Sequence, residues 1–249
     1  MTGAGNNTYL LVPPDQDGAV LIDTGIGDAR HLDELAHVLR EAKAPLVHVL
    51  VTHGHADHAS GAPALAAAHP GASFAKHPWP DEDAKYPIAW QRLNDGDRVH
   101  GLTVLHTPGH APDHLAFWHE PTGTIFTGDL VVLGSSVMIH WSRGGDLAQY
   151  LASLERLRAL APHVLLPAHG PPIVDPAAVL TAYLDHRHAR ERQILAALRA
   201  GLDTVPRIVE SIYDGLAPAL LPAARENVRA HLEKLKAEGR AADENGRWS

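Results

Sequence analysis

The stretch Val47-His48-Val49-Leu50-Val51-Thr52-His53-Gly54-His55-Ala56-Asp57-His58 decides the fold. It predicts a buried strand that ends directly in a cluster of imidazole and carboxylate groups, the ligands that suit zinc, iron or manganese. His53 and His55 are two residues apart, so in extended backbone they project to the same side and can hold one ion. Asp57 and His58 lie near a helix start and can face a second ion. In a chain of this length and composition, the pattern His-x-His-x-Asp-His is expected by chance only about 0.01 times.

Three more polar residues follow other predicted strands. His110 comes after Thr103–His106, Asp129 after Thr124–Thr127, and His169 after Val164–Leu166. Side chains at the carboxyl ends of several strands meet at one edge of a sheet, where functional sites are usually built. A glycine beside each of them lets the backbone approach closely.

The rest of the chain alternates short apolar runs with helical patterns, which predicts a mixed layered fold of strands and helices. After residue 176 the chain becomes helical, and its end reads helix, helix and a hairpin around Asn245-Gly246. This order resembles a winged-helix module. The further predicted elements are strands Tyr9–Val12, Ala19–Ile22 and Leu115–His119, and helices around Leu32–Leu39, Asp57–Ala68, Leu147–Leu157 (capped by Asp146), Ala177–Ala200, Val205–Tyr213 and Ala223–Glu238.

Composition limits the classes of protein that fit. The chain has 249 residues, 29 acidic against 21 basic side chains, 19 histidines and no cysteine. The net charge of -8 disfavours nonspecific binding to polyanions such as duplex DNA, and the lack of cysteine excludes disulfides and thiolate sites. We expect no signal peptide, no association with membranes and a cytoplasmic location, because neither an export signal nor an apolar run of about 18 residues is visible.

The order His53-x-His55-x-Asp57-His58, then His110, Asp129 and His169, resembles the metallo-β-lactamase superfamily. That resemblance implies an α+β fold, a four-layer αββα sandwich holding two metal ions. It further implies that His53, His55 and His110 bind the first ion, that Asp57, His58 and His169 bind the second, and that Asp129 bridges both. Two zinc ions are expected, with iron or manganese as alternatives.

Other segments resemble the β-lactamase-like protein 2 subgroup of the superfamily. They are Asn6–Leu10, Ile22–Gly25 and Tyr183–Glu191, followed by the tail with its winged-helix pattern. The expected domains are a catalytic domain over 1–176, a connecting helix over 177–200 and a small C-terminal winged-helix-like domain over 201–249. Flavodiiron relatives carry Glu where this chain has His55, which favours hydrolysis over redox chemistry.

A two-metal site lowers the pKa of a bridging water and polarises the bond to be cleaved. We expect Asp57 to orient the resulting hydroxide, to shuttle its proton or to serve as a plain ligand. We expect Asp129 to take part in catalysis as the bridge. Metal-bound histidines usually donate their second N–H to an acceptor, and the candidates are Asp23 and Asp113. His114 either supports the same contacts or packs as a strand residue.

Substrate contacts are predicted for a helical face and a loop. His186 and Arg190 share a face that points either to a cleft or to solvent. From Gly201 onward the tail has seven basic and eight acidic residues, unlike a DNA-reading domain. Its expected role is packing on the catalytic domain, pocket closure or contact between two copies in a homodimer. The residues expected to touch substrate are His186, Arg187, Arg190, Trp141 and Arg143.

The sequence therefore predicts a binuclear metal-dependent hydrolase acting on a small acyl substrate, either a thioester, an ester or a lactone. An endoribonuclease for single-stranded RNA is the main alternative, implied by the subgroup. The acidic charge of the chain disfavours it, because a nuclease groove normally combines basic and aromatic side chains. The remaining alternative is a DNA-binding metal sensor.

Overall fold

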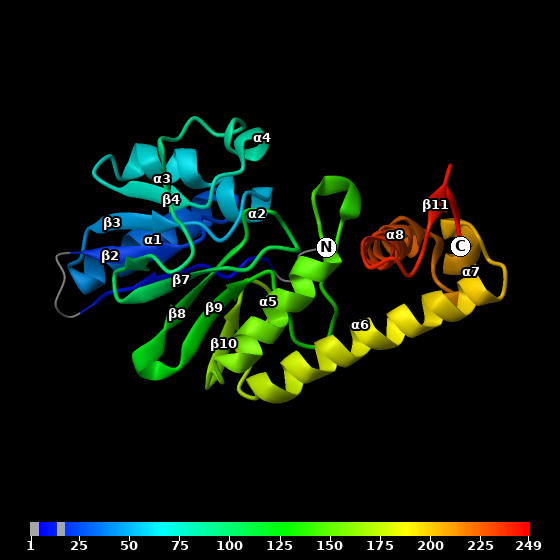
Figure 1. Cartoon of the computed structure of the whole chain (residues 1–249). Helices are drawn as coiled ribbons and strands as arrows, with labels where there is room; N and C mark the ends of the chain where they lie inside the picture. Colours follow the sequence, from blue (N-terminus) through cyan, green and yellow to red (C-terminus); the bar gives the residue numbers. More distant parts are fainter. Residues whose placement is uncertain (1–4, 14–17) are drawn as a thin grey trace.

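The computed structural model describes residues 5–13 and 18–249. Two five-stranded sheets face each other and are covered on their outer sides by helices, which gives the expected αββα sandwich (Figure 1). The first sheet has the order β1-β2-β3-β4-β5, with β1 antiparallel and the others parallel. Its strands are β1 (Tyr9–Leu11), β2 (Ala19–Ile22), β3 (Leu46–Leu50), β4 (Ser73–Lys76) and β5 (Trp90–Arg92).

The second sheet has the order β10-β9-β8-β7-β6, and only its β10–β9 pair is parallel. Apolar side chains from the inner faces of both sheets, such as Ile22 and Leu50 opposite Val104 and Phe117, form a core between them. The strands of this sheet are β6 (Arg98–Val99), β7 (Leu102–His106), β8 (Leu115–His119), β9 (Thr124–Gly128) and β10 (Val164–Pro167).

The outer faces of the sheets pack on separate helical layers. On the first sheet, α1 (Ala29–Ala42) contributes Leu35 and Leu39 to the core, and Asp28 caps its first turn. On the second sheet, α5 (Leu147–Ala159) and the first half of α6 (Pro176–Arg199) contribute residues such as Tyr150 and Leu180. Asp146 caps α5 by accepting a hydrogen bond from the Gln149 N–H, as the sequence predicts.

The helix predicted from Asp57 to Ala68 is wrong as a single element, since it forms two helices, α2 (Ala56–Ala59) and α3 (Ala62–Ala68). The break lies at Gly61, whose N–H donates to the Gly25 carbonyl at 2.9 Å instead of continuing α2. A Cβ at Gly61 would lie only 2.4 Å from the Thr24 carbonyl oxygen. The close approach of this turn to the loop after β2 therefore requires glycine.

Helix α6 joins the sandwich to a small C-terminal domain, drawn in orange and red in Figure 1. Its first half packs on the second sheet, whereas Ile194 and Ala197 belong to the core of the small domain together with Ile208 and Leu232. Residues Asn245 and Gly246 adopt positive φ at the hairpin turn, as predicted. The domain consists of α7 (Val205–Ile212), α8 (Leu221–Ala237), β11 (Asp243–Glu244) and β12 (Arg247–Trp248).

Several short elements were not predicted, including β4, β5, β6 and α4 (Pro80–Asp83). Three 3-10 turns complete the described chain: Glu120–Thr122, Trp141–Arg143 and Pro218–Leu220. Within residues 5–13 and 18–249 no helix is long and apolar enough to cross a membrane.

Candidate metal centre

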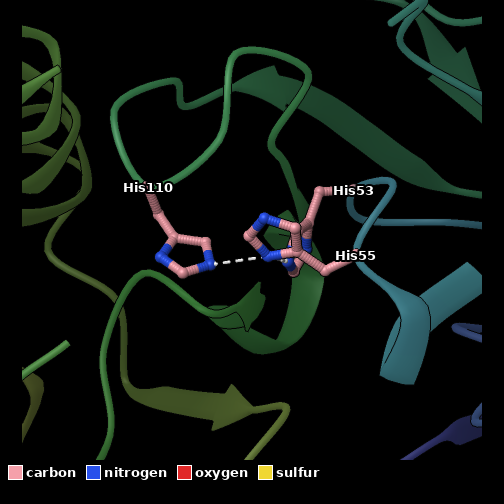
Figure 2. Close-up of side chains that lie close together, drawn as sticks. All are labelled: His53, His55 and His110. Atoms are coloured by element: carbon pink, nitrogen blue, oxygen red, sulfur yellow. Dashed lines mark hydrogen bonds between the residues drawn. The ribbon is translucent and has the colours of Figure 1, made fainter. Parts of the chain in front are cut away.

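Three histidines converge at the ends of β3 and β7 (Figure 2). The Nε2 atom of His53 lies 2.9 Å from Nδ1 of His55, and the Nε2 atom of His110 lies 3.1 Å from that same Nδ1. His53 is fully buried and His110 is 9% exposed. Three ring nitrogens within 4.8 Å of one another can act together as ligands of one metal ion.

A second group of donors lies beside the first. It contains Asp57, His58 and His169, whose ligand atoms also lie within 4.8 Å of one another. Oδ2 of Asp57 is 3.4 Å from Nε2 of His169 and 3.8 Å from Nε2 of His58. Asp57 and His58 come from α2, and His169 follows β10, so two layers of the fold build this group.

Asp129 stands between the two groups, directly after β9. Its Oδ1 lies 3.5 Å from Nε2 of His58 and 3.3 Å from Nε2 of His169. Its Oδ2 lies 3.6 Å from Nε2 of His110. One carboxylate oxygen therefore faces each group, which is the geometry that a bridging ligand needs.

The unpaired atoms of the site fit a cation. Within the described part of the chain, neither Nε2 of His58 nor Oδ1 of Asp129 has a hydrogen-bond partner, although both are buried. Unsatisfied polar atoms are costly in the interior. Imidazole and carboxylate donors suit zinc, iron or manganese, so the residues present fit the expected metal ions.

The remaining ring nitrogens of three predicted ligands hold their imidazoles in place. Nδ1 of His58 donates to Oδ2 of Asp23 at 2.8 Å, and Asp23 also accepts from the Thr52 N–H at 2.8 Å. Nδ1 of His110 donates to the Met138 carbonyl at 3.0 Å. Nδ1 of His169 donates to the Gly5 carbonyl at 2.8 Å. Each contact leaves Nε2 free to face the cluster.

Burial and neighbouring charges divide the histidines into two kinds. Burial lowers the pKa of His53 well below its ordinary value and that of His55 to about 3, so both imidazoles are neutral, the form that coordinates metal. The carboxylates of Asp129 and Asp57, 3.3 and 3.4 Å from its Nε2, raise the pKa of His169 to about 10. Burial would lower the pKa of His58, but Asp23 and Asp129 outweigh it and raise the pKa well above its ordinary value. The carboxylates around His58 and His169 therefore favour a positive charge at this position, either a proton on the imidazole or a bound cation.

Asp113 does not contact an imidazole of the proposed ligands in the described structure, which corrects the expectation for this residue. Its Oδ2 accepts from the Gly54 N–H at 2.8 Å and pairs with Nζ of Lys76 at 2.9 Å. It thus holds the backbone of the loop between His53 and His55 rather than a ring. His114 accepts the Asp129 N–H on Nε2 at 3.1 Å and contacts Thr107 through Nδ1, so it fixes the backbone of Asp129.

Lys76 was missed by the sequence analysis. It is only 1% exposed, and its ammonium also contacts Oδ1 of Asp83 at 2.5 Å. The available signal was weak: Lys76 directly follows the apolar pair Phe74-Ala75, where a strand was not predicted. Its partner carboxylates explain how a charge can be buried there.

The predicted substrate contacts mostly serve other purposes. Arg187 is 2% exposed and donates to the Val137 carbonyl, which corrects the expectation that it contacts substrate. The guanidinium of Arg190 lies 4.1 Å from the Tyr213 ring centroid, in the C-terminal domain. Trp141, 42% exposed, is covered on one side by Arg229 at 4.7 Å. The structure brings neither Arg143 nor His186 into the ligand cluster, and both are exposed.

Comparison with protein families identifies the chain. The model of the metallo-beta-lactamase superfamily matches residues 1–169, and the beta-lactamase associated winged helix domain matches residues 204–248. The chain therefore belongs to the metallo-β-lactamase superfamily. It is a hydrolase of that superfamily with a C-terminal winged-helix domain, as the sequence predicts.

Individual relatives agree with this assignment. A beta-lactamase-like protein 2 homolog of Drosophila melanogaster is 33% identical over 260 residues, covering 96% of this chain and 85% of that protein. An atrochrysone carboxyl ACP thioesterase of Aspergillus chevalieri is 36% identical over 222 residues, covering 84% and 68%.

Solved structures show the same architecture. A metallo-beta-lactamase family protein of Thermus thermophilus has a TM-score of 0.76 and 25% identity, covering 98% of this chain and 93% of that one. A protein solved in a di-iron-bound form has a TM-score of 0.60 and 31% identity, covering 69% and 91%.

Proposed function

We propose that this chain is a binuclear metal-dependent hydrolase that cleaves acyl substrates, with thioesters as the first class to test and esters and lactones after them. The observation that carries the proposal is the placement of Asp129, whose two oxygens face two separate groups of donors. Zinc is the expected ion, and the relative solved with two iron ions supports a site for two cations. When bound, two such ions ionise water near neutral pH and polarise the substrate carbonyl.

The residues of the chain divide the remaining work. Asp129 holds the two halves of the site at a fixed separation, and Asp23 and Met138 orient the imidazoles of His58 and His110. Asp57 is 27% exposed in its side chain, so its carboxylate can orient the attacking water and take its proton. We propose this proton transfer as the function of Asp57 beyond that of a ligand.

The surroundings of the site favour an acyl substrate. Trp79, partly exposed, lies beside His55 with ring centroids 6.1 Å apart, and Pro112 packs against Gly144 next to it. These apolar groups offer a wall for an acyl chain. The relative named as a thioesterase supports the same substrate class.

The RNA alternative lacks the basic and aromatic surface that it needs. Arg187 is buried, Arg190 stacks on Tyr213 and Trp141 lies against Arg229. The chain carries a net charge of -8. A phosphodiester backbone would therefore meet few free cationic side chains.

One preparation with zinc bound should be tested in parallel on an acyl thioester, an acyl lactone and a fluorogenic single-stranded RNA. We expect hydrolysis of an acyl substrate by the wild type and at least about a 100-fold loss in Asp57→Asn, the range for a lost general base. Cleavage of RNA alone, abolished by the same substitution, would contradict the acyl proposal. A wild type that binds no metal would contradict the whole assignment.

A further inference from the structure

The segment 130–145 connects Asp129 to α5 and is held by side chains of the two helices that cover the second sheet. Tyr183 of α6 accepts the Val132 N–H at 2.9 Å, and its hydroxyl lies 2.9 Å from the Ser135 carbonyl. Tyr150 of α5 donates to the Leu130 carbonyl at 2.7 Å. Irregular backbone beside the site therefore depends on side chains from two helices for its shape.

Arg187 lies one helical turn after Tyr183 and contacts the same segment. Its guanidinium donates to the Val137 carbonyl and, through Nη1, to Oδ1 of Asn227 at 3.3 Å, and it lies 5.4 Å from the Tyr150 ring centroid. Arg187 is only 2% exposed. Across the described residues, no carboxylate forms an ion pair with it, and its Nε has no hydrogen-bond partner.

A buried arginine without a carboxylate partner is less favourable here than an apolar side chain, because its charge loses hydration without gaining a counter-charge. Burying a charge without a counter-charge is strongly unfavourable, and an apolar residue of similar volume is often at least as stabilising. Stability therefore does not account for Arg187. The directional hydrogen bonds of its planar guanidinium do what an apolar side chain cannot, because they fix the position of particular oxygen atoms.

The carbonyl next to the one that Arg187 holds belongs to Met138, and it accepts Nδ1–H of His110 at 3.0 Å. We propose that Arg187 is a positioning residue for His110. By fixing the Val137 carbonyl it sets the direction of the Met138 carbonyl, which in turn orients the His110 ring so that Nε2 faces His53, His55 and Asp129. This inference rests on the proposed metal site.

The same contacts give the C-terminal domain a role in the site. Asn227 belongs to α8, so the chain of contacts runs from the winged-helix domain through Arg187 and Val137 to the Met138 carbonyl and His110. A neighbouring residue of α8, Glu226, accepts the Ser142 N–H at 3.0 Å on its Oε2. The small domain therefore acts as an internal brace of the loop at the metal centre.

The test compares Arg187→Met, which keeps the volume and removes the hydrogen bonds, with Arg192→Met, an exposed position on the same helix. Zinc affinity of each ion is measured by competition with a chelator. In Arg187→Met we expect the first ion to bind about 10- to 100-fold more weakly, the range for lost partners of metal-bound imidazoles. In Arg192→Met the zinc affinity should equal that of the wild type.

A second measurement does not depend on metal. Nitrogen-15 NMR of the His110 ring reports whether Nδ1 carries a proton held in a hydrogen bond, and we expect this signal to be lost in Arg187→Met. If that variant fails to fold, Asn227→Leu tests the same chain of contacts, and Asn227→Asp, which keeps the acceptor oxygen, should restore wild-type zinc affinity.

The outcomes separate the two proposals. A wild type without zinc would contradict the metal site while the NMR signal still tests the role of Arg187. Normal zinc affinity together with an intact His110 signal in folded Arg187→Met, even with a lower melting temperature, would overturn the positioning role and leave Arg187 as a structural residue.

Discussion

At the scale of single residues, the site depends on side chains that each serve two neighbours. Asp129 places one oxygen toward His58 and His169 and the other toward His110, while its N–H is held by His114. Burial would raise the pKa of Asp129, but His58 and His169 outweigh it and hold the pKa well below its ordinary value. The carboxylate is therefore ionised throughout the neutral range, as a bridge between cations requires.

Replacing Asp129 with Ala should release metal and abolish hydrolysis. Losing a residue that binds both ions directly should lower metal affinity at least about 100-fold, because losing a hydrogen-bond partner of a ligand already lowers it about 10- to 100-fold. Elemental analysis after dialysis and the rate of acyl hydrolysis measure the two effects. Asp185→Ala, an exposed carboxylate on α6, is the control. Full zinc content in Asp129→Ala would show that Asp129 is not a ligand.

The residue contacts also show where sequence reasoning stops. The predicted ligands come together because the motif from His53 to His58 and the later ligands each follow a strand, and strand ends share an edge. Nothing in the spacing of α6 revealed that Arg187 turns inward to a carbonyl, since helical periodicity defines a face and not its partner. Asp113 was expected to accept a hydrogen bond from a metal-binding imidazole, because carboxylates commonly do so. Its Oδ2 instead pairs with the buried Lys76 and accepts from the Gly54 N–H.

At the scale of elements, the turns between strands determine where the ligands lie. His110 follows Gly109, which has φ of +128° and packs directly on the first turn of α5. The predicted helix from Asp57 to Ala68 failed for a similar reason, because Gly61 leaves the helix to bond with the loop after β2. Strands β4 and β5 were missed because neither contains a β-branched residue or a run of three apolar residues, so neither has the composition typical of a strand.

Gly109→Ala should destabilise the protein by at least about 2 kcal/mol, from backbone strain and overpacking together. A Cβ there would lie 2.2 Å from the Tyr150 backbone nitrogen, so the turn must shift and carry His110 with it. Gly101→Ala is the matched control, since Gly101 also has positive φ but no atom lies within 4 Å of its added Cβ. Urea unfolding of both variants gives the comparison, and equal losses would contradict the importance of the close contact.

The junction between α6 and α8 predicts a pH dependence of stability. Burial would raise the pKa of Glu191, but hydrogen bonds from Lys234 and Arg240 outweigh it and hold the pKa below its ordinary value of 4.5. The pairing therefore stabilises the fold fully above pH 4.5 and loses its effect as the pH falls through the lower folded-state pKa.

Glu191→Gln should remove this contribution. We expect the difference in free energy of unfolding between wild type and Glu191→Gln to be constant near neutral pH and to shrink below pH 4.5. Denaturant unfolding at a series of pH values measures it, with Glu210→Gln, an exposed glutamate on α7, as the control. A difference that stays unchanged down to about pH 3 would contradict the lowered pKa.

At the scale of the whole molecule, α6 links two hydrophobic cores. Its residues Leu180 and Tyr183 pack with the second sheet, whereas Ile194 and Ala197 pack with α7 and α8. The division into 1–176, 177–200 and 201–249 stays a prediction, but one continuous helix of 24 residues shared by both cores implies that they unfold together. The hydrogen bond between Arg187 and Asn227 connects the same two parts beside the candidate metal centre.

Leu232→Ala in the core of the small domain should therefore lower the melting temperature of the entire chain. Leu232 is fully buried, and such a truncation costs about 2–5 kcal/mol. At about 2–4 °C per kcal/mol for a chain of this size, the single transition should shift downward as one unit in calorimetry. Leu220→Ala, at a side chain that is 43% exposed, should leave the transition nearly unchanged. If Leu232→Ala instead splits the transition into an early step and an unshifted main step, the small domain unfolds on its own, and the coupling through α6 is too weak to transmit its stability to the sandwich.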